Sequence, residues 1–167
     1  ALYGERIEID LNNIMYDFAE AFLQAHEGAE FEDLTYEMIH EAAIQPTFDA
    51  ETFAKAKHDE QVELIVADLK AAYARRAKLI ADTVRPVMER IYEDRKDQLD
   101  SNIYFPITDG HLGYNVPVNL LRCKETDGAE IFRVFSKVVM FTTIDDAWRE
   151  HLREMDDLRQ SVQNATY

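Results

Sequence analysis

The stretch from Ala129 to Tyr167 constrains the fold most, because it keeps one helical period without interruption. No Pro or Gly falls inside it, and Gly128 comes just before it. At about 1.5 Å per residue, such a helix would reach about 50 Å, which exceeds the core of one small domain. Its apolar residues recur three or four positions apart and so share one face. They are Ile131, Phe135, Val138, Phe141, Ile144, Trp148, Leu152, Met155, Leu158 and Val162.

The size and composition of the chain favour a mainly helical fold. Its 167 residues are 47% hydrophobic, so they can bury a core, and the length favours one domain with at most a small appendage. Gly and Pro are few, at five and four. Cys123 is the single cysteine, which excludes an internal disulfide and fits a reducing compartment. We find no apolar run long enough for a membrane span and no signal peptide pattern.

The net charge bears on the class of partner. The chain carries 18 Lys and Arg against 33 Asp and Glu, a formal charge of −15. An acidic surface repels a phosphate backbone, so we expect no nucleic-acid partner.

The first two helices are predicted from the spacing of their apolar residues. One helix is expected from Glu5 to Ala25, ended by Glu27 and Gly28. A second is expected over 33–44, since Pro46 prevents a smooth continuation. The residues expected to face the core there are Leu34, Met38, Ile39 and Ala42.

The next helical segment has two readings. Asp49 is a candidate N-cap for a helix from Ala50, but the residues 57–60 are polar, so one helix with a polar middle and two helices with a turn both fit. Pro86 predicts the first turn of a further helix capped by Thr83. The residues expected to face inward in that helix are Val87, Ile91 and, as a third candidate, Leu99.

After this region the apolar period changes from about 3.6 to 2, which predicts a β-hairpin. Alternate residues are apolar from 103 to 107 and again from 114 to 120, with a turn near Asp109 and Gly110. Pro106 and Pro117 lack an amide proton, so both strands are expected to be edges. A lone two-stranded ribbon is marginal in water, so its apolar face should lie on a helix.

The sequence offers no complete catalytic or metal-binding pattern. It has no glycine-rich loop for a phosphate, and His40-Glu41 lacks the second His of a zinc-protease helix. Glu37 and His40 form one Glu-x-x-His, of which a two-metal bundle site needs two. Cys123 has no nearby cysteine and is expected to be an inert thiol. We therefore predict no catalytic, cofactor-binding or metal-binding residue in this chain.

The region around Trp148 combines dense charge with the apolar face. Oppositely charged side chains three or four residues apart can stabilise a helix by about 0.2–0.5 kcal/mol per pair. The candidate pairs are Asp145 with Arg149, Glu150 with Arg153, and Asp156 with Arg159. Two explanations of the apolar face stay open, namely ordinary core packing and docking of another helix.

The string from Thr143 to Gln160 resembles a segment of the SecA family, the ATPase motors of bacterial preprotein translocation. That segment has the form Thr-(Ile/Leu)-Asp-x-x-Trp-(Lys/Arg)-x-His-Leu-x-x-Met-Asp-x-Leu-(Lys/Arg)-Gln, and the match is nearly position by position. The resemblance implies a mainly α, helical scaffold and wing fragment with one long C-terminal helix. The small β-hairpin predicted above is not part of the commonest family pattern, and we interpret it as an insertion. The resemblance assigns 1–25 to the tail of the long scaffold helix, 26–100 to the wing, 101–122 to a hairpin insertion, and 123–167 to the returning scaffold helix.

In the family, that returning helix is the first arm of a two-helix finger whose tip meets the preprotein at the SecYEG channel. The resemblance therefore implies preprotein or channel contact by Tyr167, Thr166 and Asn164. It implies scaffold packing for Trp148, Leu152, Met155, Leu158 and Val162. The tip departs from the common Gly-Ile-His-Leu-Arg-Gly-Tyr form, since here it reads Ser161-Val-Gln-Asn-Ala-Thr-Tyr167.

The implied function is mechanical, as part of a motor whose ATP and Mg²⁺ sites lie in segments outside this chain. Implied partners are the other SecA domains, the SecYEG channel and the preprotein. The implied location is the cytoplasm, peripheral to the inner face of the bacterial plasma membrane. Self-association through the stripe around Trp148 is a further expectation. The alternative is a free-standing acidic helical adaptor that docks a partner helix through that stripe, and an enzyme in its own right comes third.

Overall fold

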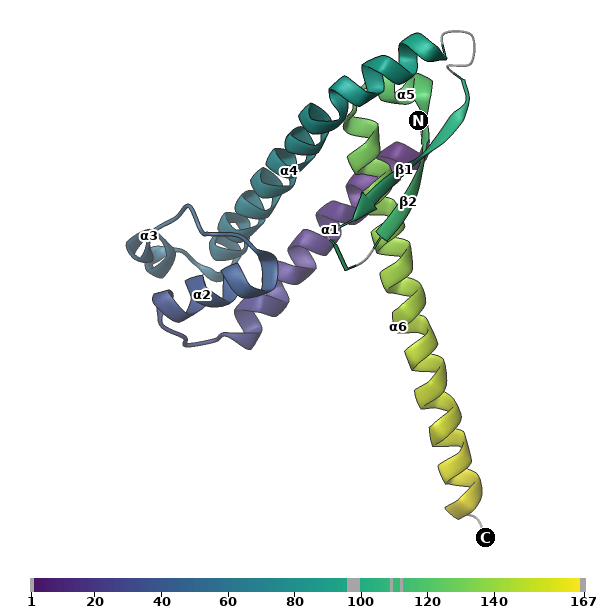
Figure 1. Cartoon of the computed structure of the whole chain (residues 1–167). Coiled ribbons are helices and arrows are strands. Elements are labelled where there is room, and N and C mark those ends of the chain that lie inside the picture. Colours follow the sequence, from purple (N-terminus) through teal and green to yellow (C-terminus); the bar gives the residue numbers. More distant parts are fainter. Residues whose placement is uncertain (1, 96–99, 109, 112, 166–167) are drawn as a thin grey trace. The chain divides into compact units, whose positions relative to one another are not determined.

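A computed structural model of the chain describes residues 2–95, 100–108, 110–111 and 113–165. It is mainly helical, with one long C-terminal helix and one antiparallel hairpin, as expected (Figure 1). The chain divides into two compact units, Ala1–Lys78 and Leu79–Tyr167, where its length predicted one domain. Helix α4 contributes residues to both units, and each unit has its own core.

The first unit contains α1 (Leu2–Ala25), α2 (Phe31–Ala42), α3 (Ala50–Lys55) and the first part of α4 (His58–Asp94). Its core confirms most of the predicted inward residues, including Leu34 and Met38 of α2. Ile39 is a correction, because its side chain is 48% exposed. Four-residue spacing aligns Leu34 with Met38, and the next residue falls outside their narrow buried face. The largest buried side chains here are Phe22, Met38, Ile65 and Val66.

Backbone signals end α2 and separate α3 from α4. Ala43 takes a left-handed conformation, and the Ile44 N–H donates to the Met38 carbonyl, which closes the helix while burying Ile44. Asp49 caps α3 as predicted, accepting from the Thr52 N–H at 2.8 Å. This bond lowers the pKa of the Asp49 carboxyl.

The polar residues 57–60 mark a break between two helices, which decides between the two predicted readings. The side chain of Glu60 reaches back and accepts from the Lys57 N–H at 2.8 Å, in the manner of a capping box. Helix α4 therefore starts at His58, two residues after Ala56, which is extended.

In the second unit, α4 continues through Pro86, where a new helix was predicted. The Thr83 hydroxyl donates to the Leu79 carbonyl at 2.7 Å inside the helix, so Thr83 is no cap. Because the helix is continuous, Met88 is buried while Val87 is 50% exposed, which corrects the predicted inward residue. Ile91 packs against the core as expected, and Leu99 lies outside the described residues.

The hairpin is confirmed as strands β1 (Asn102–Thr108) and β2 (Gly113–Asn119). Val116 and Val118 are fully buried against α4 and α6, so the apolar face lies on helices as expected. Pro106 lies opposite Asn115, and Pro117 lies opposite Tyr104. These two cross-strand pairs are two positions apart along the ladder, so both prolines belong to the same alternating set of pairs. Their nitrogens therefore face the outer edges, where a missing proton costs no ladder bond. Asp109, in the predicted turn, lies outside the described residues.

A short helix, α5 (Leu120–Glu125), which was not predicted, precedes the long helix α6 (Ala129–Ala165). Asn119 caps it by accepting from the Arg122 N–H at 3.1 Å. Helix α6 begins at the predicted residue. Over the described residues, none of the helices has the length and apolarity that a bilayer crossing requires.

Candidate interaction surface

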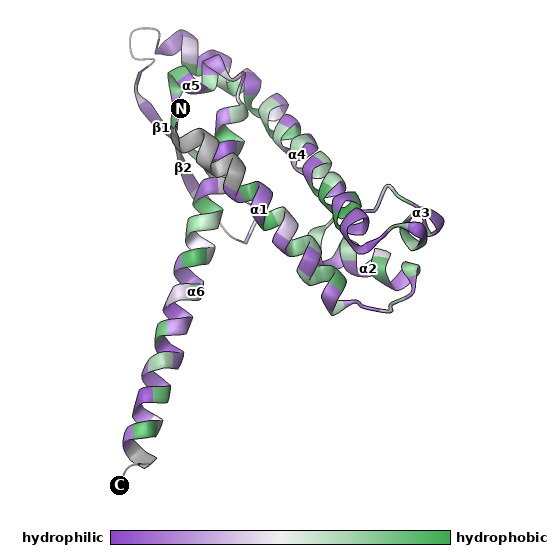
Figure 2. Ribbon diagram, turned by 180° about the vertical axis from the view of Figure 1, so that it is seen from behind, coloured by the Kyte–Doolittle hydropathy of each residue, from purple (hydrophilic) through white to green (hydrophobic). Residues whose placement is uncertain are grey.

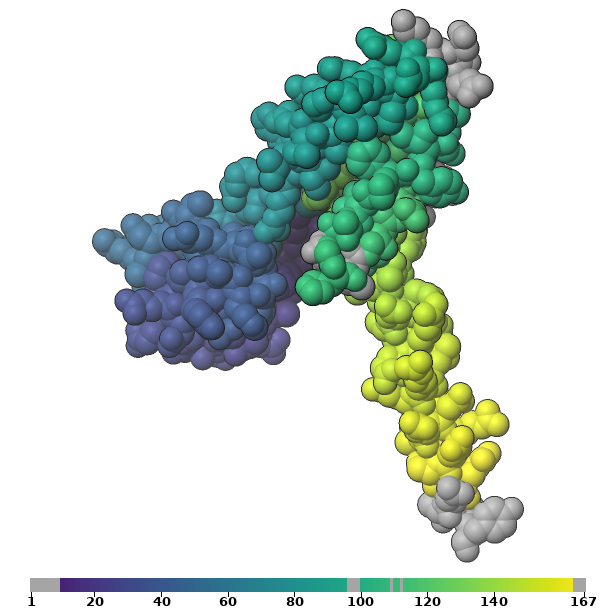
Figure 3. Space-filling view, viewed as in Figure 1, coloured from purple at the N-terminus to yellow at the C-terminus, as the bar shows by residue number. Residues whose placement is uncertain are grey.

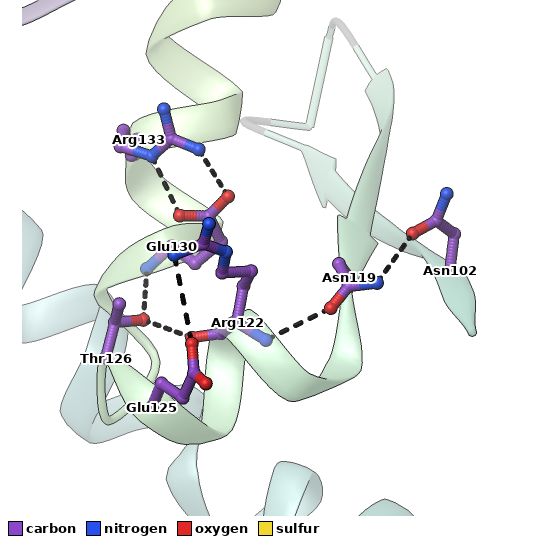
Figure 4. A network of polar contacts seen from close by, with 7 residues as sticks. All are labelled: Asn102, Asn119, Arg122, Glu125, Thr126, Glu130 and Arg133. Carbon is purple, nitrogen blue, oxygen red and sulfur yellow. Dashed lines mark hydrogen bonds and ion pairs between the residues drawn. The ribbon is translucent and has the colours of Figure 1, made fainter. Parts of the chain in front are cut away.

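The start of α6 is held by a network that links the hairpin, α5 and α6 (Figure 4). Asn119 accepts from the Arg122 N–H and donates to the Asn102 side chain at 3.3 Å. The Thr126 hydroxyl donates to the Arg122 carbonyl at 2.8 Å and accepts from the Glu130 N–H at 3.1 Å. The Arg122 carbonyl also accepts from the Thr126 N–H at 3.0 Å, so the hydroxyl adds a second bond to that carbonyl and serves an otherwise unpaired amide in the first turn of α6.

A buried charge pair lies at the first turn of α6. Glu130 is buried and accepts two bonds from Arg133, at 2.8 Å from Nε and 2.5 Å from Nη2. A bidentate pair of this kind is directional, and Glu130 also complements the positive end of the helix dipole. The pair therefore fixes the beginning of the helix where the chain turns.

Two left-handed residues make the turn between α5 and α6. Asp127 has φ of 50° and Gly128 has φ of 87°. The Gly128 N–H donates to the Cys123 carbonyl at 2.8 Å, which closes α5. Asp127 also accepts from Arg85 of α4 at 2.7 Å. The direction in which α6 leaves the core is thus set within the second unit.

Only the first turns of α6 are packed in a core. Ile131 and Phe132 are buried, and the rings of Phe135 and Tyr114 meet edge to face with centroids 5.9 Å apart. Every residue from 141 to 163 is exposed. Figures 1 and 3 show this later part of α6 running on beyond the hairpin.

The exposed part carries a continuous apolar face, which we call the α6 stripe. Figure 2 shows hydrophobic and hydrophilic residues alternating along it. The side chains of the stripe are 48–61% exposed. Packing in the core of the unit, one of the two explanations left open by the sequence, therefore does not account for them. The α6 stripe consists of Phe141, Ile144, Trp148, Leu152, Met155, Leu158 and Val162.

Charged residues flank the stripe, and two of the three predicted pairs form. Arg149 contacts Asp145 at 2.5 Å and Asp146 at 3.5 Å, and Arg153 contacts Glu150 at 3.0 Å. The third predicted pair, between Asp156 and Arg159, is not formed in the described part of the chain. All of these side chains are exposed, so each pair adds only a few tenths of a kcal/mol to the helix.

The residues expected to contact a preprotein or channel are among the last in the sequence. Tyr167 and Thr166 lie outside the described residues. Asn164 lies within α6, and its side chain also lies outside what the structure describes. The five residues expected to pack in a scaffold all belong to the α6 stripe and present an apolar surface that can receive another helix.

Other reactive groups are isolated from one another. Cys123 is buried, and desolvation raises the pKa of its thiol to about 11, which disfavours the reactive thiolate. The Glu-x-x-His pair forms one contact of 3.8 Å between Glu37 and His40. Within the described residues, no three or more His, Cys, Asp or Glu side chains gather as metal ligands.

The first unit has an open cleft of about 800 Å³ that the sequence did not reveal. Its lining combines apolar residues such as Phe31 and Phe53 with the pair Glu20–His58, whose atoms are 2.7 Å apart. These residues come from four helices, so no local motif signals the cleft. The cleft holds no cluster of catalytic groups.

Comparison with known proteins agrees with the resemblance of the α6 string and extends it. Residues 2–167 match the family described as SecA Wing and Scaffold domain. The chain is 37% identical to the protein translocase subunit SecA of Porphyromonas gingivalis over 168 residues, and 37% identical to that of Parabacteroides distasonis over 167. The SecA of Bacteroides fragilis is 33% identical.

In each of these comparisons all of this chain is covered, hairpin included, but only 15% of the relative. No solved structure matches the chain. Because the family match spans both units and the whole of α6, this chain belongs to the SecA wing and scaffold domain family.

Proposed function

We propose that this chain is the helical scaffold and wing region of a SecA-type motor, with a mechanical and interaction role in preprotein translocation. One observation carries the proposal: the family match covers the chain, and the Thr143–Gln160 string lies on the part of α6 that is exposed on all sides. In this assignment 1–25 is the tail of the scaffold helix, 26–100 the wing, 101–122 an inserted hairpin, and 123–167 the first arm of a two-helix finger.

The proposed partners follow from that assignment. Another segment of the same motor covers the α6 stripe, and the end of the helix contacts the preprotein and the SecYEG channel through Tyr167, Thr166 and Asn164. ATP and Mg²⁺ bind in segments outside this chain, so hydrolysis occurs elsewhere in the motor. The motor works in the cytoplasm, peripheral to the inner face of the bacterial plasma membrane.

The construction of α6 suits the transmission of movement. The helix has 37 residues, which corresponds to about 55 Å. Its first turns are fixed by buried Ile131 and by the Glu130–Arg133 pair, while its far part lies outside the core. A displacement of the core is therefore carried along the helix as a rigid body, and Tyr167, which follows the helix in the sequence, offers both apolar area and a hydroxyl for gripping a chain.

The experiment that tests the role of Tyr167 uses the whole protein. Tyr167→Ala should slow preprotein translocation into vesicles that carry the channel, while ATP binding stays unchanged. Tyr167→Phe keeps the ring and should retain most of the transport. Equal loss of transport and ATP binding, or no loss of either, would contradict the assignment to the fingertip.

A second measurement tests whether the motor itself covers the stripe. Amide hydrogen exchange across 141–163 should be slower in the whole protein than in this chain alone at low concentration, because a covering segment resists local opening. Equally fast exchange in the whole protein and in this chain alone would contradict the covering of the stripe by the motor. If a separate helical protein then slowed the exchange, the alternative function, a helical adaptor, would be supported instead.

A further inference from the structure

The cleft of the first unit is lined by side chains of two kinds. Its apolar surface comes from Leu23 and Leu34, which are buried, and from the half-buried rings of Phe31 and Phe53, whose centroids are 5.9 Å apart. Three carboxylates border the same space, and none of the described residues that line it is Lys or Arg. From this combination we propose that the cleft binds a linear aliphatic polyamine, a chain of methylene groups that carries several ammonium groups. The three carboxylates belong to Glu20, Glu27 and Glu30.

Two of these carboxylates are available to an external cation. The side chains of Glu27 and Glu30 have no hydrogen bond or ion pair in the part of the chain that the structure describes. Glu30 stands at the N-cap of α2, yet its carboxylate makes no capping bond. The ends of α1 and α2 also border the cleft, but their dipoles have opposite signs there. The carboxylates therefore decide the sign of the charge.

The two histidines of the lining do not neutralise these free carboxylates. His58 contacts Glu20 at 2.7 Å, and His26 contacts Glu41 at 3.3 Å. When either histidine is protonated, its charge is balanced by the carboxylate that it already contacts. The other two carboxylates of the lining stay uncompensated within the described residues, so they attract a cation from outside the chain.

The apolar surface of the cleft decides which kind of cation fits. A hydrated metal ion gains little from phenylalanine rings, and no three metal-ligating side chains gather within the described residues. The methylene groups of a polyamine can instead cover Leu23 and Leu34, and an ammonium group over a ring gains a cation–π contact. An ammonium group donates hydrogen bonds and accepts none, which matches carboxylates, since these only accept.

The size of the cleft also suits a small organic ligand. Its volume of about 800 Å³ lies within the range of about 300–1,000 Å³ that is typical of small-molecule sites. Small residues keep the space open, and a Cβ added to Gly28 would meet no atom within 4 Å. These small residues are Gly28, Ala29, Ala50 and Ala54. A polyamine can therefore lie in the cleft with its ammonium groups near different carboxylates.

Isothermal titration calorimetry with spermidine tests the site. For a ligand of this size we expect one saturable site with a dissociation constant of about 0.1 mM, at about 0.15 M salt, which screens weak binding to the acidic surface. Glu27→Gln and Glu30→Gln should each raise that constant about threefold, and the double variant about tenfold. Glu32→Gln is the matched control, because Glu32 is exposed and loses the same charge but does not line the cleft. It should leave the constant unchanged.

A second set of titrations tests the apolar surface. Phe53→Leu keeps an apolar side chain but removes the ring, so spermidine should bind about threefold more weakly. Because Phe53 also stacks on Phe48, far-UV circular dichroism checks that this variant is folded. Mg²⁺ serves as the probe that has charge but no methylene groups, and it should bind the unaltered chain much more weakly than spermidine. This comparison needs no variant, so the apolar contribution is tested even if Phe53→Leu unfolds.

Amide chemical shifts locate the bound spermidine, and they should change mainly within 20–34 and 50–61. Changes spread over both units, equal weakening by Glu32→Gln and Glu30→Gln, or binding no tighter than that of Mg²⁺ would indicate general attraction to an acidic surface and would overturn the proposal. A short peptide of alternating Lys and Leu that binds the same amides more tightly than spermidine overturns the polyamine as the occupant. None of these variants alters α6 or tests transport, so the result is independent of the proposed motor function.

Discussion

Two isoleucines of α6 allow a direct test of where the helix is anchored. Ile131 is fully buried in the core of the second unit, whereas Ile144 is 60% exposed. Ile131→Ala removes three methylene-sized groups at about 0.8 kcal/mol each, and the cavity left behind raises the cost to about 3 kcal/mol. At Ile144 the side chain covers mainly its own helix, and the higher helix propensity of Ala offsets the lost contact. We expect a change within about 0.5 kcal/mol there.

The assay must report on the second unit alone, because the chain has two cores and a global unfolding curve would mix them. Hydrogen exchange of the amides of β2, followed by mass spectrometry, gives the opening free energy of that unit. The chain should be held at about 1 µM, so that the self-association expected from the sequence does not contribute to the measurement. Equal shifts for Ile131→Ala and Ile144→Ala, or a shift below about 1 kcal/mol for Ile131→Ala, would refute the anchoring of α6 at its beginning alone.

Three further predictions concern the second unit. Gly128→Ala forces a side chain into left-handed backbone and should cost about 1 kcal/mol in the same exchange assay, whereas Gly113→Ala, at ordinary φ, should cost less. Because burial raises the pKa of Cys123 from 9.0 to about 11, its contribution to stability is fully present below pH 9 and is lost as the pH rises towards 11. Because a global urea curve mixes the two cores, the measurement is the difference in unfolding free energy between this chain and its Cys123→Ala variant, which should shrink as the pH rises from 9 to 11. Replacing Pro106 and Pro117 together by Val adds an amide donor to each outer edge of the hairpin, where another chain can pair with it. Light scattering should therefore show faster aggregation. An unchanged rate would contradict the idea that the prolines protect these edges.

Local rules in the sequence predicted much of the fold. The change of apolar period from 3.6 to 2 located the hairpin, and its prolines were correctly placed on edge strands. Asp49 was identified as a cap, and α6 was predicted from its first residue. These features depend on residues close together in the chain, where dihedral preferences and side-chain spacing act directly. The Thr143–Gln160 string, which indicated the family, was likewise recognised from residues close together in the sequence.

Several predictions failed where distant packing outweighed a local signal. Pro86 was expected to begin a helix, but the helix runs through it, because the core contacts of Val84 and Met88 on either side stabilise a continuous α4. Helix α5 was missed because its six residues are too few to show a helical period. The cleft of the first unit was missed because its residues come from four separate helices.

By itself, the sequence determined the helical class, the hairpin, the length of α6 and the three- or four-residue spacing of its apolar face, because these follow from periodicity along the chain. Only the tertiary structure decided that the chain has two cores and that α6 is packed at Ile131 but exposed around Trp148. An apolar stripe has the same spacing whether it lies in a core or faces water, since periodicity records which residues share a face and not what covers that face.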